Sequence, residues 1–220
     1  MERCTFKKLD YVLRKPKNFT ADTKYPLVIY LHGAGGRGRD INLIYTHPFF
    51  SDTVEFLQEA VCVAPQCYAD TWFDIFEQVQ EFVEYAISWG FVDATRVYLV
   101  GASMGGYGTW QLAMTKPEWF AAIIPICGGG MYWNAGRLIH MGVWAFHGSK
   151  DGAVFCEESQ KMVNAVQANG GTAKMTIYEN GLHNAWTDTF RNPEVWKWLL
   201  SNKSHFQTTK SEYDNVEQFG

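Results

Sequence analysis

Residues 97–106 read VYLVGASMGG, an apolar, strand-like run followed by a serine with a glycine two residues to either side. The pattern Gly-x-Ser-x-Gly covers residues 101–105, and a segment with helical character follows at residues 107–115. Glycines keep Cβ atoms out of a sharp strand-to-helix turn, and such a turn lifts the serine hydroxyl above the sheet. The stretch therefore predicts that Ser103 is a nucleophile. The alternative is a glycine-rich turn with an incidental serine.

Further apolar runs rich in β-branched and aromatic residues recur along the chain, with room for a helix between most of them. They lie at residues 27–31, 61–64, 122–126, 143–146 and 175–178. Because these runs lack polar alternation, we expect parallel strands that are buried on both faces. Residues 6–13 alternate more, and we expect an antiparallel edge strand there. Helices are expected at residues 75–89, 107–115, 157–168 and 192–200.

The composition predicts one folded domain. The chain has 220 residues, of which 47% are hydrophobic and 19% charged, enough apolar material for a sizeable core. We expect an α/β catalytic domain over residues 1–202 and a polar tail over residues 203–220. The net charge of −4 contains no long run of either sign, so neither nucleic acid nor a membrane surface is an expected partner.

The five cysteines are odd in number and form no C-x-x-C pair, which argues against a disulfide framework or a zinc knuckle. The first fifteen residues, MERCTFKKLDYVLRK, hold no apolar core of a signal peptide, and no stretch approaches about 18 apolar residues. We expect a cytoplasmic protein with reduced thiols. A secreted protein whose signal peptide had been removed would look the same. The sequence makes no prediction of the oligomeric state.

A serine nucleophile needs a base, and histidine is the usual one. On a sheet of this type the expected chain order is serine, acid, histidine, which leaves His183 and His205. His205 lies in the polar tail. His183 lies between the last expected strand and the last expected helix, where a loop reaches the edge of the sheet, so His183 is the predicted base. The alternative is a histidine on a surface loop.

The predicted acid is Asp151, in FHGSKDG at the end of the strand over residues 143–146. Its alternative interpretation is a turn aspartate next to a glycine. Glu157 and Glu158 are nearby, but acidic residues are common in the first turn of a helix for dipole reasons alone. His147 is interpreted as a buried or turn residue rather than as the base.

The segment LHGAGG at residues 31–36 follows a strand and is rich in small residues. Small residues allow backbone amides to approach an oxyanion, so we expect an oxyanion hole built from the amides of Ala34 and Met104.

A dinucleotide fingerprint also fits this region, with Gly33, Gly35 and Gly38 at the required spacing. That hypothesis needs an acidic residue at the end of the second strand, about 20 positions on. The second strand is instead followed by Ala64-Pro65-Gln66, which disfavours nucleotide binding.

Taken in order, HGAGG, GASMGG, FHGSKD and GLHNAW make the chain resemble the α/β-hydrolase superfamily over residues 25–200. It looks most like the compact esterase branch with dienelactone-hydrolase-like, feruloyl-esterase-like and prolyl-oligopeptidase-like enzymes. The resemblance implies a Ser103, Asp151 and His183 triad on a mainly parallel sheet of seven or eight strands, with the site at their carboxyl ends. Many relatives have Gly and Asp where Leu182 and Asn184 flank the histidine here.

Larger relatives insert a lid after the strand that corresponds to residues 122–126. Only sixteen residues, 127–142, separate that strand from the next one here, too few for a lid domain, so we expect an open cleft. Loops at the same edge supply bulky side chains as candidates for substrate contact, with ordinary packing as the alternative for each: Trp72, Met131, Tyr132, Trp133 and Trp186.

The predicted function is a serine carboxylesterase that hydrolyses small or medium esters through an acyl-enzyme, without a metal or cofactor. A serine peptidase of the prolyl-oligopeptidase type uses the same three groups and is the first alternative. The second is a non-catalytic binding protein on a hydrolase scaffold.

Overall fold

The computed structural model describes residues 1–204 and contains one eight-stranded sheet. The strand order is β1-β2-β4-β3-β5-β6-β7-β8. The strands are β1 (Glu2–Phe6), β2 (Leu9–Arg14), β3 (Tyr25–Leu31), β4 (Val61–Pro65), β5 (Val92–Ala102), β6 (Ala122–Ile126), β7 (Gly142–Gly148) and β8 (Ala173–Tyr178). The six strands from β3 to β8 run parallel, which confirms the predicted mainly parallel sheet.

The two N-terminal strands are antiparallel and differ from the expectation in one respect. Residues 6–13 are not one edge strand, because the chain reverses at Lys7, whose φ is 53°. β1 pairs with β2, and β2 pairs with β4, both antiparallel. The apolar alternation breaks at Lys7 and Lys8, two consecutive polar residues between Phe6 and Leu9, so this pair is the sequence signal of the reversal that the expectation overlooked.

Helices alternate with the strands. The α-helices are α1 (Asn42–Tyr45), α2 (Pro48–Asp52), α3 (Phe76–Ile87), α4 (Met104–Thr115), α5 (Cys156–Ala168), α6 (Trp186–Arg191) and α7 (Pro193–Ser201). Three short 3-10 helices are η1 (Ala34–Gly36), η2 (Pro117–Trp119) and η3 (Tyr132–Leu138). The last long helix, α7, starts with proline at its first position, and the Asn192 side chain accepts a hydrogen bond from the amide of Glu194.

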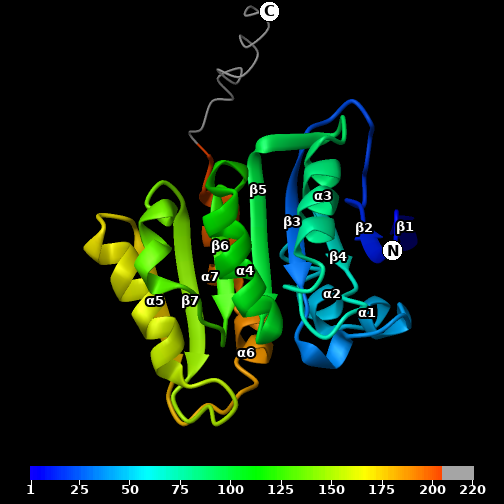
Figure 1. Ribbon diagram of the computed structural model, residues 1–220. Coiled ribbons are helices and arrows are strands. Elements are labelled where there is room, and N and C mark those ends of the chain that lie inside the picture. The colour runs from blue at the N-terminus through cyan, green and yellow to red at the C-terminus, as the bar shows by residue number, and fades with distance from the viewer. Residues whose placement is uncertain (205–220) are drawn as a thin grey trace, which may run out of the picture.

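The layers are helix, sheet, helix. In Figure 1, α3, α4 and α5 cover one face of the sheet, while α7 lies behind it. Two buried clusters correspond to these faces. One joins the sheet to α3, α4 and α5, and the other joins it to α1, α2, α6 and α7.

The central strand β3 shows why polar alternation is absent. Leu27, Ile29 and Leu31 pack in the first cluster, whereas Val28 and Tyr30 pack in the second. All seven residues of β3 are buried, because both faces of a doubly covered sheet are core.

The carboxyl ends of the parallel strands meet at one edge of the sheet, where α6 also lies (Figure 1). Ser103 follows β5, Cys127 follows β6, Asp151 comes soon after β7, and His183 comes soon after β8. The chemistry-bearing loops therefore share one edge, as expected for a sheet of this topology.

Between β6 and β7 the structure contains only η3 and connecting residues, which agrees with the predicted lack of a lid domain. Most of the predicted tail, residues 205–220, lies outside the described residues, and so does His205. The predicted domain boundary at residue 202 therefore stays a prediction. Within residues 1–204, no helix has the length and apolar character needed to cross a membrane.

A buried aromatic cluster formed by β3, α2, α6 and α7 provides a stability test. Phe190 is fully buried and packs against the rings of Tyr30, Phe49 and Trp196. Phe190→Ala should lower the free energy of unfolding by about 3 to 5 kcal/mol, because the change leaves a cavity. The measurement is urea unfolding. The matched control is Phe155→Ala, where 67% of the side chain is exposed and a change within about 0.5 kcal/mol is expected. Equal effects of the two substitutions would contradict this description of the core.

Candidate active site

Ser103 occupies a strained turn between β5 and α4. Its φ is 56° and its ψ is −117°, a conformation that non-glycine residues rarely adopt. The turn is held by backbone hydrogen bonds: the Ser103 amide donates to the carbonyl oxygen of Ile126 at 2.9 Å, and the Tyr107 amide donates to the Ser103 carbonyl at 3.0 Å. The strain is therefore fixed by neighbouring elements.

Close packing explains the two glycines of the motif. A Cβ at Gly105 would overlap the carbonyl oxygen of Leu31, and a Cβ at Gly101 would overlap the carbonyl oxygen of Gly105. Helix α4 can therefore start directly against the ends of β3 and β5, because neither position carries a side chain.

The structure brings Ser103, His183 and Asp151 into one hydrogen-bonded chain. The Nε2 atom of His183 lies 2.9 Å from Ser103 Oγ, and its Nδ1 atom lies 2.7 Å from Asp151 Oδ2. A carboxylate accepts only, so Nδ1 carries the proton and Nε2 is free to accept the serine hydroxyl proton. This tautomer is the one that a general base at Ser103 needs.

The Asp151 carboxylate is buried and well supplied with donors. Its side chain has no exposed surface, and Oδ1 accepts hydrogen bonds from the amides of Ala153 and Val154, each at 2.9 Å. Burial by itself raises the pKa of Asp151, but the hydrogen bonds from His183 and from the two amides outweigh it and bring the pKa below its usual value. The acid is therefore ionised at neutral pH.

The predicted oxyanion loop is anchored by a buried histidine. His32 Nε2 accepts a hydrogen bond from the Cys67 amide at 2.9 Å, so Nδ1 carries the proton and donates to the Gly33 carbonyl at 2.6 Å. The indole of Trp72 donates to the His32 carbonyl at 3.0 Å. Burial lowers the pKa of His32 to about 4, which keeps the ring in this neutral form.

Ala34 and Met104 each begin a helix, η1 and α4 respectively. The first amides of a helix have no acceptor within it, so both are suited to bind negative charge. Ala34 lines the same cleft as Ser103. Their role as an oxyanion hole remains a proposal.

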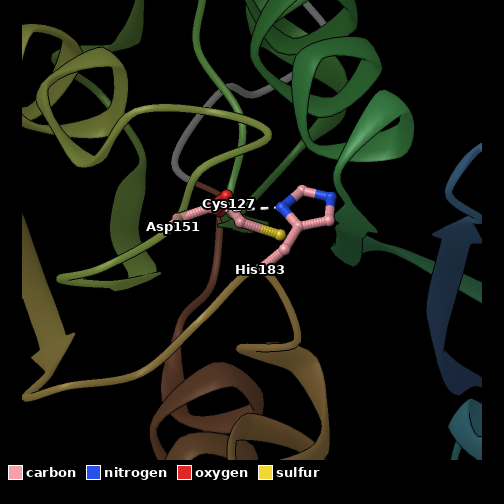
Figure 2. A group of neighbouring side chains, drawn as sticks. All are labelled: Cys127, Asp151 and His183. Atoms are coloured by element: carbon pink, nitrogen blue, oxygen red, sulfur yellow. Dashed lines mark hydrogen bonds and ion pairs between the residues drawn. The ribbon is translucent and has the colours of Figure 1, made fainter.

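Cys127, directly after β6, lies beside Asp151 and His183, and Figure 2 shows the three side chains together. One ligand atom from each lies within 4.8 Å of the others. Metal binding requires a thiolate, but burial raises the pKa of Cys127 to about 12. Both Asp151 oxygens already accept hydrogen bonds, so this chemistry does not favour a metal site.

Comparisons with known proteins agree with this geometry. Residues 66–135 match the model of the prolyl oligopeptidase family. A probable feruloyl esterase C of Aspergillus oryzae is 22% identical over 178 residues, which cover 79% of this chain and 66% of that protein. The solved structure of a thermostable esterase is 32% identical and superposes with a TM-score of 0.80. The match covers 92% of this chain and 62% of the esterase chain.

The chain has the α/β-hydrolase fold. Est1E from Butyrivibrio proteoclasticus shares the fold, with a TM-score of 0.67 and 18% identity over 86% of this chain and 95% of that one. The chain spans just under two thirds of the length of the feruloyl esterase and of the thermostable esterase.

A cleft of about 340 Å³ opens at Ser103 and His183. Of the predicted contact residues, Trp186 lines this cleft, and its ring packs edge-on against His183 with 5.6 Å between centroids. The prediction for Trp72 is wrong: the residue has no exposed surface, because it packs in the core and its indole donates a hydrogen bond to the His32 carbonyl.

Met131, Tyr132 and Trp133 are exposed at the start of η3, but they do not line the cleft at Ser103. Met131 lines a second hollow, together with Tyr107 and Glu158. Substrate contact by these three residues remains a proposal.

The cleft also contains residues that the sequence analysis did not single out, namely Tyr30, Leu43 and His47. Tyr30 is one of several buried residues of β3, and His47 caps the N-terminus of α2, so neither position stands out in the sequence. Cys127 was missed as well, although its place directly after β6 was a usable signal. Glu157 and Glu158 lie in the first turn of α5, as expected for helix-opening residues.

The neutral His32 ring predicts a pH dependence of stability. Its pKa is lowered in the folded chain, so the unfolded chain binds more protons between about pH 6.5 and pH 4. The contribution of His32 to the free energy of unfolding should be complete above about pH 6.5. It should decrease towards pH 4, by up to about 1.4 kcal/mol per pH unit. Urea midpoints across that range should fall less steeply in His32→Gln than in the wild type. His140→Gln, at an exposed position, is the matched control, and parallel curves for His32→Gln and the wild type would contradict the prediction.

Proposed function

We propose that this protein is a serine carboxylesterase that hydrolyses small or medium carboxylic esters through an acyl-enzyme. One observation carries the proposal: the continuous hydrogen-bonded chain from Ser103 Oγ through His183 to the buried Asp151 carboxylate. That geometry provides an activated nucleophile, a base in the required tautomer and an ionised acid.

In the acylation half, Ser103 Oγ attacks the ester carbonyl carbon while His183 Nε2 takes the hydroxyl proton. The carbonyl electron pair moves to oxygen, and the amides of Ala34 and Met104 stabilise this oxyanion; each such donor is worth about 3 kcal/mol. The intermediate collapses, the carbon–oxygen bond to the alcohol breaks, and His183 gives its proton to the leaving alkoxide. Ser103 is then acylated.

In the deacylation half, a water molecule takes the place of the alcohol. His183 removes a proton from the water as the water oxygen attacks the acyl carbon. The second tetrahedral intermediate releases the carboxylic acid, and the proton on His183 returns to Ser103 Oγ. Asp151 holds the His183 ring in one tautomer and stabilises its cationic form throughout; it does not itself take the proton.

The dimensions and lining of the cleft support a substrate of modest size. About 340 Å³ lies at the lower end of the range of small-molecule sites, and Tyr30, Leu43 and Trp186 make much of its wall apolar. Because the feruloyl esterase of Aspergillus oryzae is named for an aromatic acid ester, methyl ferulate belongs in the substrate panel.

A serine peptidase acting on small peptides is the second candidate, favoured by the match of residues 66–135 to the prolyl oligopeptidase family. Both reactions use the same groups, so the leaving group decides between them. An amine is a poorer leaving group than an alcohol and depends more strongly on proton delivery from His183.

The proposed partner is a small-molecule ester. All five cysteines are free, in keeping with a reducing compartment, so we propose a cytoplasmic location. Secretion is the alternative.

The first test uses Ser103→Ala on nitrophenyl esters of rising acyl length, methyl ferulate, an acetylated sugar and a prolyl nitroanilide. The wild type should hydrolyse esters in preference to the anilide. The variant should lose essentially all of the activity, because Ser103 Oγ is the group that is hydrogen-bonded to His183 Nε2. Preference for the anilide would favour the peptidase. An inactive wild type would favour a non-catalytic binding protein.

The second test concerns the acid. Asp151→Asn should lower kcat by about 10⁴, because the amide favours the wrong tautomer of His183. Glu157→Gln and Glu158→Gln serve as controls for loss of a nearby carboxylate and should stay within about twofold of the wild type, since His183 Nδ1 is hydrogen-bonded to Asp151. Near wild-type activity of Asp151→Asn would show that another carboxylate serves His183.

A further inference from the structure

A second imidazole contacts the Asp151 carboxylate. His147 lies on β7, has no exposed surface, and places Nε2 3.2 Å from Asp151 Oδ2. That oxygen is also the one that accepts the hydrogen bond from His183. The reaction described above gives His147 no role, although a buried histidine next to the acid bears directly on the charge that His183 experiences.

The acceptors around Nε2 fix one proton on the ring. Nε2 of His147 lies 2.9 Å from the carbonyl oxygen of Val154 as well as 3.2 Å from Asp151 Oδ2. A carbonyl oxygen and an ionised carboxylate can only accept. Nε2 must therefore carry a proton.

The contacts around Nδ1 account for a second proton. Nδ1 of His147 lies 2.7 Å from Ser159 Oγ, which lies 2.8 Å from the carbonyl oxygen of Gly128. If Nδ1 carries a proton, it donates to Ser159, and the Ser159 hydroxyl donates to Gly128. If Nδ1 is bare, Ser159 must donate to it, and the Gly128 carbonyl loses that donor. Only the doubly protonated ring satisfies every contact.

A buried imidazolium needs a counter-charge, and Asp151 provides one within hydrogen-bond reach. The other ionisable groups around the pair do not compete. Burial raises the pKa of Cys127 at the end of β6 to about 12, and it also raises the pKa values of Tyr107 on α4 and Cys156 on α5. These three groups are therefore neutral near pH 7. Glu158 on α5 forms an ion pair with Lys161 at 3.2 Å.

We propose that His147 is a positioning residue: a buried imidazolium that anchors Asp151 and offsets part of its negative charge. The contact with His147 keeps Asp151 Oδ2 between the imidazole rings of His147 and His183. The positive charge makes a second imidazolium at His183 less favourable, so loss of His147 should make turnover more sensitive to acid. The effect on turnover rests on the proposed esterase function, whereas the protonation of His147 does not.

The direct test is nitrogen NMR of the whole protein labelled with ¹⁵N-histidine at pH 7.5. His147 should show two protonated ring nitrogens. Its signals are identified by their loss in His147→Gln or their shift in Ser159→Ala. A ring with one protonated and one bare nitrogen would overturn the proposal. This experiment needs no turnover, so it decides the matter even if the protein hydrolyses no ester.

The kinetic test is the pH profile of kcat/KM in His147→Gln. Glutamine can still donate to Val154 and Asp151 but carries no charge. The midpoint of the acid limb should move upward by about one pH unit, the size expected for loss of one charge at short range in a partly screened site.

His32→Gln is the matched control at another buried histidine. It should lower activity by loosening the oxyanion loop without moving the acid limb. A His147→Gln profile that superposes on the wild type after scaling would show that His147 only packs, and would overturn the proposal. If His147→Gln does not fold, the spectrum of the wild type, assigned through Ser159→Ala, still decides.

Discussion

The candidate site contains a carboxylate without exposed surface, that of Asp151, and the arrangement of the loops around it follows from its need for hydrogen-bond donors. An unpaired buried charge costs several kcal/mol, so each oxygen of Asp151 must meet donors. The turn after β7 supplies two amides, from Ala153 and Val154. The loop after β8 supplies His183, and β7 itself supplies His147. One buried charge thereby fixes the positions of two loops relative to the sheet.

Ser103, the proposed nucleophile, is under a different constraint, because neighbouring elements hold its backbone in a strained conformation. Ser103 keeps its unfavourable φ of 56° because its amide donates a hydrogen bond to the carbonyl of Ile126 at the end of β6, and because α4 starts at the next residue. The helix can approach so closely because Gly105 has no side chain where it passes Leu31. His183 lies between Ser103 and Asp151 and is hydrogen-bonded to both. The helices that follow His183 in the chain are anchored by the buried rings of Phe190 on α6 and Trp196 on α7.

The fold is largely predictable from the sequence, because strands buried on both faces leave uninterrupted apolar runs and the glycine motif marks the sharpest turn. The hairpin at Lys7 was missed because only one pair of consecutive lysines interrupts the alternation there. Within the candidate site, chain order and strand ends single out the three central residues. Trp72 could not be assigned correctly, because a loop position does not reveal that the indole turns inward to His32. The contacts of His147 were equally inaccessible, since they depend on Ser159 of α5, a helix that packs on one face of the sheet.

The central claim is that Ser103 is the one nucleophile activated by His183 and Asp151. Its most direct test is reaction of the whole protein with a fluorophosphonate, followed by intact mass and peptide mapping. The account predicts a single adduct per chain, located on Ser103, and adduct formation that is strongly slowed in Asp151→Asn and absent in Ser103→Ala. An adduct on another residue, or undiminished labelling of Ser103→Ala, would contradict it.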